Sequence, residues 1–235
     1  MRSMKAGMVN FSGNGTTYQG YLSPSSSGKG PGVIVIQEWW GLVGHIKAVA
    51  DRLAEAGFTA LAPDFYHGKA TTEPDEAGSL MMALNIDDAA KVIHGAVDLL
   101  LGHEAVSSEK VGVVGFCMGG QLALYAATID PRIGGAVDFY GIHPNVKPDL
   151  ASLHCPLLGI FAEHDDYASP EAVRELSDRL RSVGKEHEFH TYPGTRHAFF
   201  NDDRPEVFNE SAAEDAWDRV LAFFEKNIGA PTPKA

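Results

Sequence analysis

Residues 110–128, KVGVVGFCMGGQLALYAAT, constrain the fold of this chain more than any other segment. The segment begins with a short run of valines, which is typical of a parallel strand covered on both faces, and residues 121–128 carry Leu and Ala at helical spacing. Only GFCMGG separates the two patterns, and its glycines permit a very sharp bend. The segment therefore predicts a buried strand, a tight turn and a helix in immediate succession.

Cys117 lies at the apex of this turn. A nucleophile at a strand-to-helix elbow has a strained backbone, and its side chain is pushed out of the turn above the positive end of a helix. Because that helix end favours thiolate over thiol, the position suits a reactive cysteine. The alternative interpretation is a small buried residue on a well-packed turn, as most free cysteines are.

Length and composition narrow the class of protein. A chain of 235 residues fits one large α/β domain over residues 1–235, and its net charge of −12 argues against nucleic acid or anionic membranes as partners. No stretch approaches the roughly 18 apolar residues needed to span a bilayer, and the N-terminus lacks an apolar signal core. We therefore expect a cytoplasmic protein. Its two cysteines lack disulfide or zinc spacing, and we expect no metal and no cofactor.

The remaining chain alternates strand and helix patterns. The predicted strands are residues 4–11, 18–23, 33–36, 58–62, 111–114, 133–139, 156–162 and 186–192. The predicted helices are residues 45–56, 87–101, 121–128, 170–183 and 212–227. Residues 1–30 should form an edge hairpin and a loop, residues 67–76 a loop, and residues 229–235 a frayed tail. The alternation predicts an α/β fold with a mostly parallel central sheet and helices on both faces.

In such sheets the binding crevice lies beyond the carboxyl ends of the strands. Four turns at predicted strand ends hold a residue capable of chemistry: Glu38, Cys117, Asp165 and His197. Acyl transfer through a thiol needs a nucleophile, a base, a carboxylate that orients the base, and donors for the oxyanion. The chain order of Cys117, Asp165 and His197 is nucleophile, acid, base, which is the order of the α/β-hydrolase fold.

The motifs QEWWG, GFCMGG, AEHDD and YPGTRHAF occur in this order, and over about residues 20–228 the chain resembles the dienelactone hydrolase family of α/β-hydrolases. By motif, Cys117 is similar to the family's nucleophile, Asp165 to its acid and His197 to its base. Glu38 is similar to the carboxylate near the thiol. The resemblance implies hydrolysis of an ester or lactone through a thioester.

The resemblance also implies that the backbone amides of Trp39 and Met118 donate to the oxyanion. Some assignments keep an alternative. Glu38 could be an exposed carboxylate at a strand end, although its place between an apolar strand and two tryptophans indicates partial burial. Asp166 could replace Asp165 as the acid, since one of the two is expected only to form the turn.

Substrate contacts are the least determined part of the site. The candidate pocket residues are Trp40, Tyr66, Tyr140, Phe199 and Asn201. The aromatic ones among them are equally consistent with core packing. Asn201 stands four positions after His197, where family members that open dienelactones have an arginine for the substrate carboxylate. The nearby cations that could replace it are His67, Lys69, Arg196 and Arg204.

The expected function is therefore a cysteine-dependent hydrolase of a small ester or lactone, as a monomer or homodimer. A broad carboxylesterase or thioesterase is an alternative substrate class. Two other classes are a non-catalytic ligand-binding protein on a hydrolase scaffold, and a redox protein that uses Cys117 through sulfenic acid. For the redox class the sequence shows no evident resolving cysteine, because Cys155 precedes Pro156 at the start of a buried strand.

Overall fold

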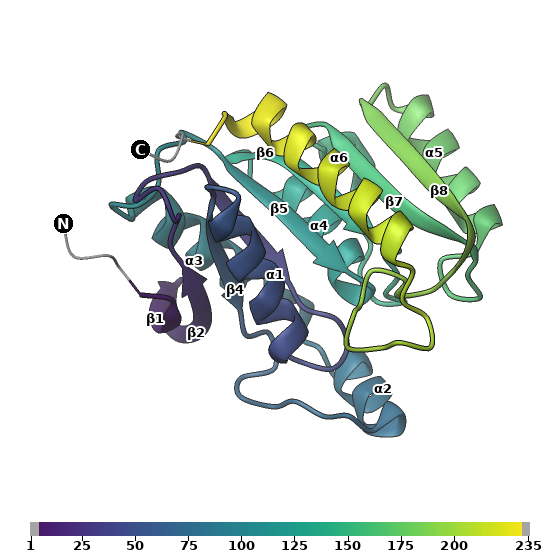
Figure 1. The fold of residues 1–235 in the computed structure, drawn as a ribbon, viewed down its shortest axis with the longest axis horizontal. Coiled ribbons are helices and arrows are strands. Elements are labelled where there is room, and N and C mark those ends of the chain that lie inside the picture. The colour runs from purple at the N-terminus through teal and green to yellow at the C-terminus, as the bar shows by residue number, and fades with distance from the viewer. Residues whose placement is uncertain (1–4, 232–235) are drawn as a thin grey trace.

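A computed structural model describes residues 5–231, which form one eight-stranded sheet with helices on both sides (Figure 1). The strands are β1 (Gly7–Gly13), β2 (Thr16–Ser23), β3 (Gly32–Ile36), β4 (Thr59–Pro63), β5 (Val111–Phe116), β6 (Ile133–Phe139), β7 (Leu157–His164) and β8 (His187–Arg196). Their order across the sheet is β1-β2-β4-β3-β5-β6-β7-β8. All pairs from β4 to β8 are parallel, and β1 and β2 join antiparallel at one edge.

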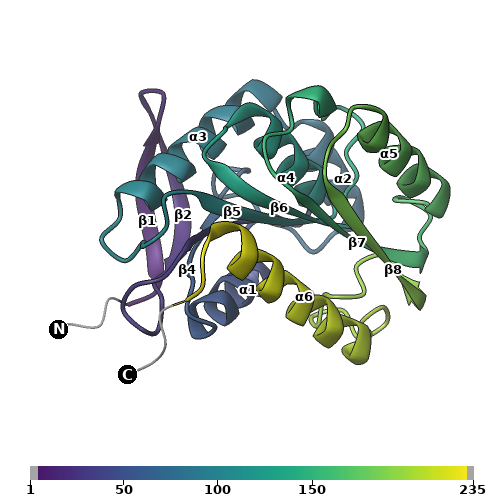
Figure 2. The same ribbon diagram turned by 90° about the horizontal axis from the view of Figure 1, so that it is seen from above.

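The helices cover both faces of this sheet. They are α1 (Gly44–Glu55), α2 (Pro74–Met82), α3 (Ile86–Gly102), α4 (Met118–Ile129), α5 (Pro170–Ser182) and α6 (Glu210–Ile228), with a short 3-10 helix, η1 (Leu150–Ser152). Figure 2 shows α1 and α6 on one face and α3, α4 and α5 on the other. The predicted α/β fold with a mostly parallel sheet is confirmed.

Two hydrophobic clusters, one on each face, hold the layers together. Between the sheet and the α1/α6 layer, the rings of Phe58 and Phe224 meet edge to face, with centroids 6.1 Å apart and neither residue exposed. Burying each ring contributes roughly 2 kcal/mol. The central strands β3, β5 and β6 are buried along their whole length, because helices cover both of their faces.

The N-terminal hairpin has the predicted tight turn, in which Asn14 and Gly15 both adopt positive φ, at 49° and 82°. The start of the predicted first strand, residue 4, and the end of the predicted tail, residues 232–235, lie outside the described residues. Residues 229–231 follow α6 without regular structure, as predicted.

Three segments differ from the sequence-based prediction, and one of them is β8, which continues to Arg196, four residues beyond the predicted end at residue 192. Residues 67–76 were expected to be a loop, but α2 begins at Pro74. The helix after β5 begins at Met118, three residues before the predicted start, because Gly119 and Gly120 are helical. This early start makes Cys117 itself the N-cap residue and brings the first turn of α4 directly against the elbow.

Candidate active site

A cavity of about 360 Å³ opens at the carboxyl ends of the parallel strands. It is lined by Glu38, Trp39, Trp40, Pro74, Met81, Cys117, Ile142, His164, Asp166, Tyr167, Arg196, His197, Ala198, Arg204 and Val207. These residues come from the last residues of β7 and β8, from the segments that follow β3, β5, β6, β7 and β8, and from α2. The topology therefore collects residues that are far apart in sequence, as the strand-end rule predicts.

Cys117 occupies the sharp elbow between β5 and α4. Its backbone is strained, with φ 55° and ψ −123°, and 8% of the residue is exposed, at the cavity wall. A Cβ on Gly115 would lie 1.8 Å from the carbonyl oxygen of Gly119, so only glycine permits this approach. The Cys117 amide donates to the carbonyl of Phe139 at 3.0 Å, and the amide of Ile142 donates to the Cys117 carbonyl at 3.2 Å. The end of β6 and the loop after it therefore hold both backbone polar groups of Cys117.

His197 and Asp165 form a buried pair beside the same cavity. Oδ2 of Asp165 lies 2.8 Å from Nδ1 of His197, and its Oδ1 accepts the amides of Tyr167 and Ala168 at 2.8 and 2.9 Å. Burial lowers the pKa of His197, but the hydrogen bonds with Asp165 and with the sulfur of Cys117 outweigh it and raise this pKa to about 10. The neighbouring Asp166 is exposed at the cavity rim. The imidazole therefore has its orienting carboxylate from Asp165.

Glu38 follows β3 and is more buried than the partial burial that its sequence context indicated, with 1% of the residue exposed. Its Oε2 accepts the side-chain amide of Asn201 at 2.8 Å, and its Oε1 has no hydrogen-bond partner. A buried carboxyl oxygen without a partner is costly. Such a group is typical of a site where a proton is exchanged.

The two predicted oxyanion donors, Trp39 and Met118, lie just after β3 and at the first position of α4. Met118 is the first residue of α4, where a backbone N–H has no acceptor within the helix. Trp39 follows Glu38 in the turn after β3 and lines the cavity with Cys117. The rings of Trp39 and Trp40 meet edge to face at 5.0 Å.

Of the predicted pocket residues, Trp40 lines the cavity, and the guanidinium of Arg204 lies 5.8 Å from its ring centroid. Tyr140 and Phe199 are fully buried behind the wall, where the Tyr140 ring lies 5.0 Å from that of His197. Asn201 is also buried, and its side-chain amide donates to Glu38. These three side chains are therefore buried behind the cavity wall and do not line the cavity.

Tyr66 likewise lies beneath the surface and donates its hydroxyl to the sulfur of Met118 at 3.1 Å. Among the cations proposed from sequence, Arg196 and Arg204 line the cavity. His67 instead interacts with Asp88 at 2.9 Å, in contact with the β1/β2 hairpin through the Tyr18 ring.

The α2 wall of the cavity, with Pro74 and Met81, was missed from sequence. A signal was present, because Pro74 at the first helical position is followed by two acidic residues, a typical helix start. Within residues 5–231, no three His, Cys, Asp or Glu side chains are grouped to hold a metal ion. No helix in that range is long and apolar enough to cross a membrane.

Residues 18–228 match the dienelactone hydrolase family. The chain belongs to the dienelactone hydrolase family. Protein usf of Aquifex pyrophilus is 39% identical over 228 residues, covering 94% of this chain and 98% of that protein. A Bradyrhizobium protein named "Probable 2-oxo-3-(5-oxofuran-2-ylidene)propanoate lactonase" is 31% identical over 234 residues, covering 94% of each chain.

The solved structure named m3DLH superposes with a TM-score of 0.85 at 23% identity, covering 95% of this chain and 98% of that one. That likeness confirms the α/β-hydrolase fold. Family membership confirms the predicted resemblance and makes this chain a dienelactone hydrolase-like hydrolase. The roles of the individual residues remain predictions.

Proposed function

We propose that this member of the dienelactone hydrolase family hydrolyses a small ester or lactone through a thioester on Cys117. The observation that carries the proposal is the convergence of Cys117 and the hydrogen-bonded pair His197 and Asp165 at one cavity. The raised pKa of His197 supports an imidazolium beside the sulfur at neutral pH. A lactone is a reasonable substrate class because the Bradyrhizobium relative carries the name of a lactonase.

In the first half of the proposed reaction, Glu38 accepts the thiol proton and the Cys117 thiolate attacks the carbonyl carbon. A carbon–sulfur bond forms while the carbonyl π electrons move to oxygen, where the amides of Trp39 and Met118 stabilise the charge. Collapse of this intermediate breaks the carbon–oxygen bond, and the imidazolium of His197 protonates the leaving alkoxide.

In the second half, neutral His197 removes a proton from water, which attacks the thioester. The carbon–sulfur bond breaks, the carboxylic acid leaves, and Cys117 and Glu38 return to their starting protonation states. Asp165 holds the imidazole in one orientation throughout and stabilises its charged form. Glu38 is suited to its role because its Oε1 is buried and unpartnered.

The test is a panel of esters and lactones, with and without a free carboxylate, assayed with the native protein and Cys117→Ala. The substitution should lower kcat/KM by at least about 10³-fold, because the oxyanion donors and binding alone retain only a small part of such catalysis. Circular dichroism of the variant checks the fold. Wild-type hydrolysis by Cys117→Ala would show that Cys117 is not the nucleophile.

The arms of the panel also separate the substrate classes. Preference for carboxylate-bearing compounds would indicate that Arg196 or Arg204, both at the cavity, contact the anion. Equal rates with neutral esters would indicate a broader carboxylesterase.

A further inference from the structure

Asp138 is a buried carboxyl group close to the elbow that the proposed reaction does not use. It lies near the carboxyl end of β6 and is not exposed, and neither of its oxygens accepts a hydrogen bond of good geometry, although the amide of Gly141 lies close by. Burying such a group costs free energy, so its presence at this position calls for a physical explanation.

Several glycines lie next to this carboxyl group. Its strand neighbours in the sheet are Gly115 on β5 and Gly159 on β7. A Cβ on Gly120 would lie 2.2 Å from Oδ1 of Asp138, and a Cβ on Gly141 would lie 2.1 Å from it. The carboxyl group therefore fills the space between the first turn of α4 and the loop after β6.

The same two segments hold the backbone of Cys117. From the end of β6 and the loop after it, Phe139 accepts the Cys117 amide and Ile142 donates to the Cys117 carbonyl, and from the first turn of α4 the amide of Gly120 donates to the same carbonyl at 2.9 Å. Between them, Tyr140 has a positive φ of 41°, as Cys117 itself does. Asp138 thus lies at the junction of the two backbone segments that fix the strained conformation of the nucleophile.

The charge state of Asp138 is sensitive near neutral pH. Burial raises its pKa to about 7, and the nearby amide of Gly141 offsets only part of that effect. In the described part of the chain, the first turn of α4 and the strand neighbours contribute no charged side chain. The titratable groups on the adjoining segments are Cys117 at the elbow and His143 beyond Gly141, whose pKa burial lowers.

We propose that Asp138 is a positioning residue for Cys117, and that its protonation state and the ionisation of the Cys117 thiol are coupled. This rests on the proposed role of Cys117. Neutral Asp138 leaves the positive end of α4 free to stabilise a thiolate. Ionised Asp138 places a second negative charge at the same helix end, where the two anions disfavour one another. The carboxyl group therefore makes the nucleophile harder to ionise as the pH rises.

The first experiment measures the rate at which iodoacetamide alkylates Cys117 from pH 5 to 10, with the labelled peptide identified by mass spectrometry. In Asp138→Asn the apparent pKa of this reaction should fall by about one unit, a typical effect of removing a nearby like charge. The wild-type profile should be broader, because two coupled groups titrate. The control Asp178→Asn, which removes an exposed carboxylate on α5, should match the wild type. Superimposable Asp138→Asn and wild-type profiles would overturn the proposal.

A second measurement does not require the Asp138 variant to fold. Coupling is reciprocal, so removing the thiol must shift the titration of Asp138. In a ¹³C-carboxyl NMR titration, the apparent pKa of Asp138 should be lower in Cys117→Ala than in the wild type. Identical titrations in the two proteins would contradict the coupling, and they would do so whether or not Cys117 is the nucleophile of the hydrolase.

Discussion

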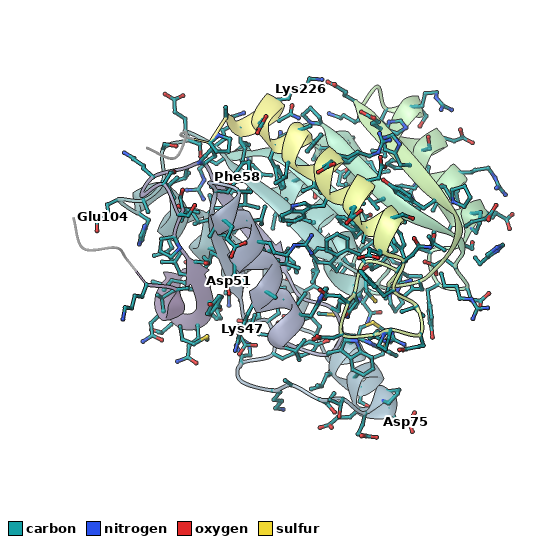
Figure 3. All side chains as sticks on the ribbon, in the orientation of Figure 1. Lys47, Asp51, Phe58, Asp75, Glu104 and Lys226 are labelled. Atoms are coloured by element: carbon teal, nitrogen blue, oxygen red, sulfur yellow. The ribbon has the colours of Figure 1, made fainter. Side chains whose placement is uncertain are left out.

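The two ends of the parallel strands, called here the amino edge and the carboxyl edge of the sheet, differ in whether their buried polar groups have hydrogen-bond partners. In Figure 3, Phe58, Glu104 and Lys226 lie toward the amino edge of the sheet, and Asp75 on α2 lies toward the carboxyl edge. At the amino edge Thr59 accepts the amide of Ser25 at 3.1 Å and donates to the carbonyl of Ala105 at 2.8 Å. Its polar atoms are therefore satisfied.

At the carboxyl edge the buried polar groups are partly unsatisfied. Within the described residues, the buried side chains that keep an unpartnered polar atom are Gln37, Glu38, His45, Asp138 and Tyr140, which follow or end β3 and β6 or begin α1. Satisfied groups stabilise a fold, whereas unsatisfied ones cost stability and recur at functional sites. The satisfied polar groups therefore lie at the amino edge, and the unsatisfied ones lie at the carboxyl edge, where chemistry is expected.

The two cysteines show the same contrast. Cys117 lines the cavity, and its sulfur is a hydrogen-bond partner of the His197 imidazole. Cys155 lies before β7 at the amino edge, and burial raises its pKa to about 12. Because the two thiols lie at opposite ends of the sheet, Cys155 is badly placed to resolve a sulfenic acid on Cys117, which argues against the redox alternative.

The largest expected effect at the carboxyl edge is that of Asp165→Asn. Loss of the charge that orients His197 should lower kcat by about 10⁴-fold with little change in fold. The matched control is Asp166→Asn, whose carboxylate is exposed and should change kcat less than about threefold, since it does not contact the imidazole. Steady-state kinetics on one ester measure both. A larger loss in Asp166→Asn would reverse the choice of acid.

The second prediction concerns pH. The pKa of His197 is raised from 6.5 to about 10, so the stability it contributes is complete below about pH 6.5 and is lost as the pH rises toward 10. The free energy of unfolding should therefore fall over this range by up to about 5 kcal/mol more in the wild type than in His197→Gln, at about 1.36 kcal/mol for each pKa unit. Urea unfolding at several pH values measures the difference. Parallel curves would mean that no such charge pair forms.

Glu38→Gln should have a smaller effect. The amide keeps the size of the side chain but cannot accept the thiol proton, so acylation should slow by about a hundredfold. Stopped-flow measurement of the pre-steady-state burst separates this step from release of the acyl group. An unchanged burst with an intact fold would remove Glu38 from the mechanism.

The smallest effect is expected at the amino edge. Thr59→Val removes a hydroxyl that satisfies Ser25 and Ala105, which should cost about 1–3 kcal/mol of unfolding free energy. Because Thr59 does not titrate, the loss should be the same at every pH, and kcat/KM should be unchanged. A variant with normal stability and reduced activity would erase the distinction between the two edges.

Much of this arrangement could be predicted from sequence. Strand and helix patterns have short periods, so local residues reveal them, and the elbow at Cys117 is recognisable because its glycines and its apolar flanks are contiguous. The positions of Glu38, Asp165 and His197 followed from one topological rule about strand ends. The missed helix α2 begins directly after the polar segment 67–73, and its signals are the helix start at Pro74 and the helical spacing of Ala77, Leu80 and Met81.

The sequence by itself determined the class of fold, the parallel sheet and the set of candidate groups at its carboxyl edge, because these depend on residue types and their local spacing. Only the tertiary structure decided which carboxylate reaches His197, that Asn201 is engaged by Glu38, and that Asp138 is buried beneath the elbow. Those outcomes depend on packing between segments far apart in the chain. Burial and the distance between charges set the protonation of such groups, and neither quantity is encoded in a local pattern.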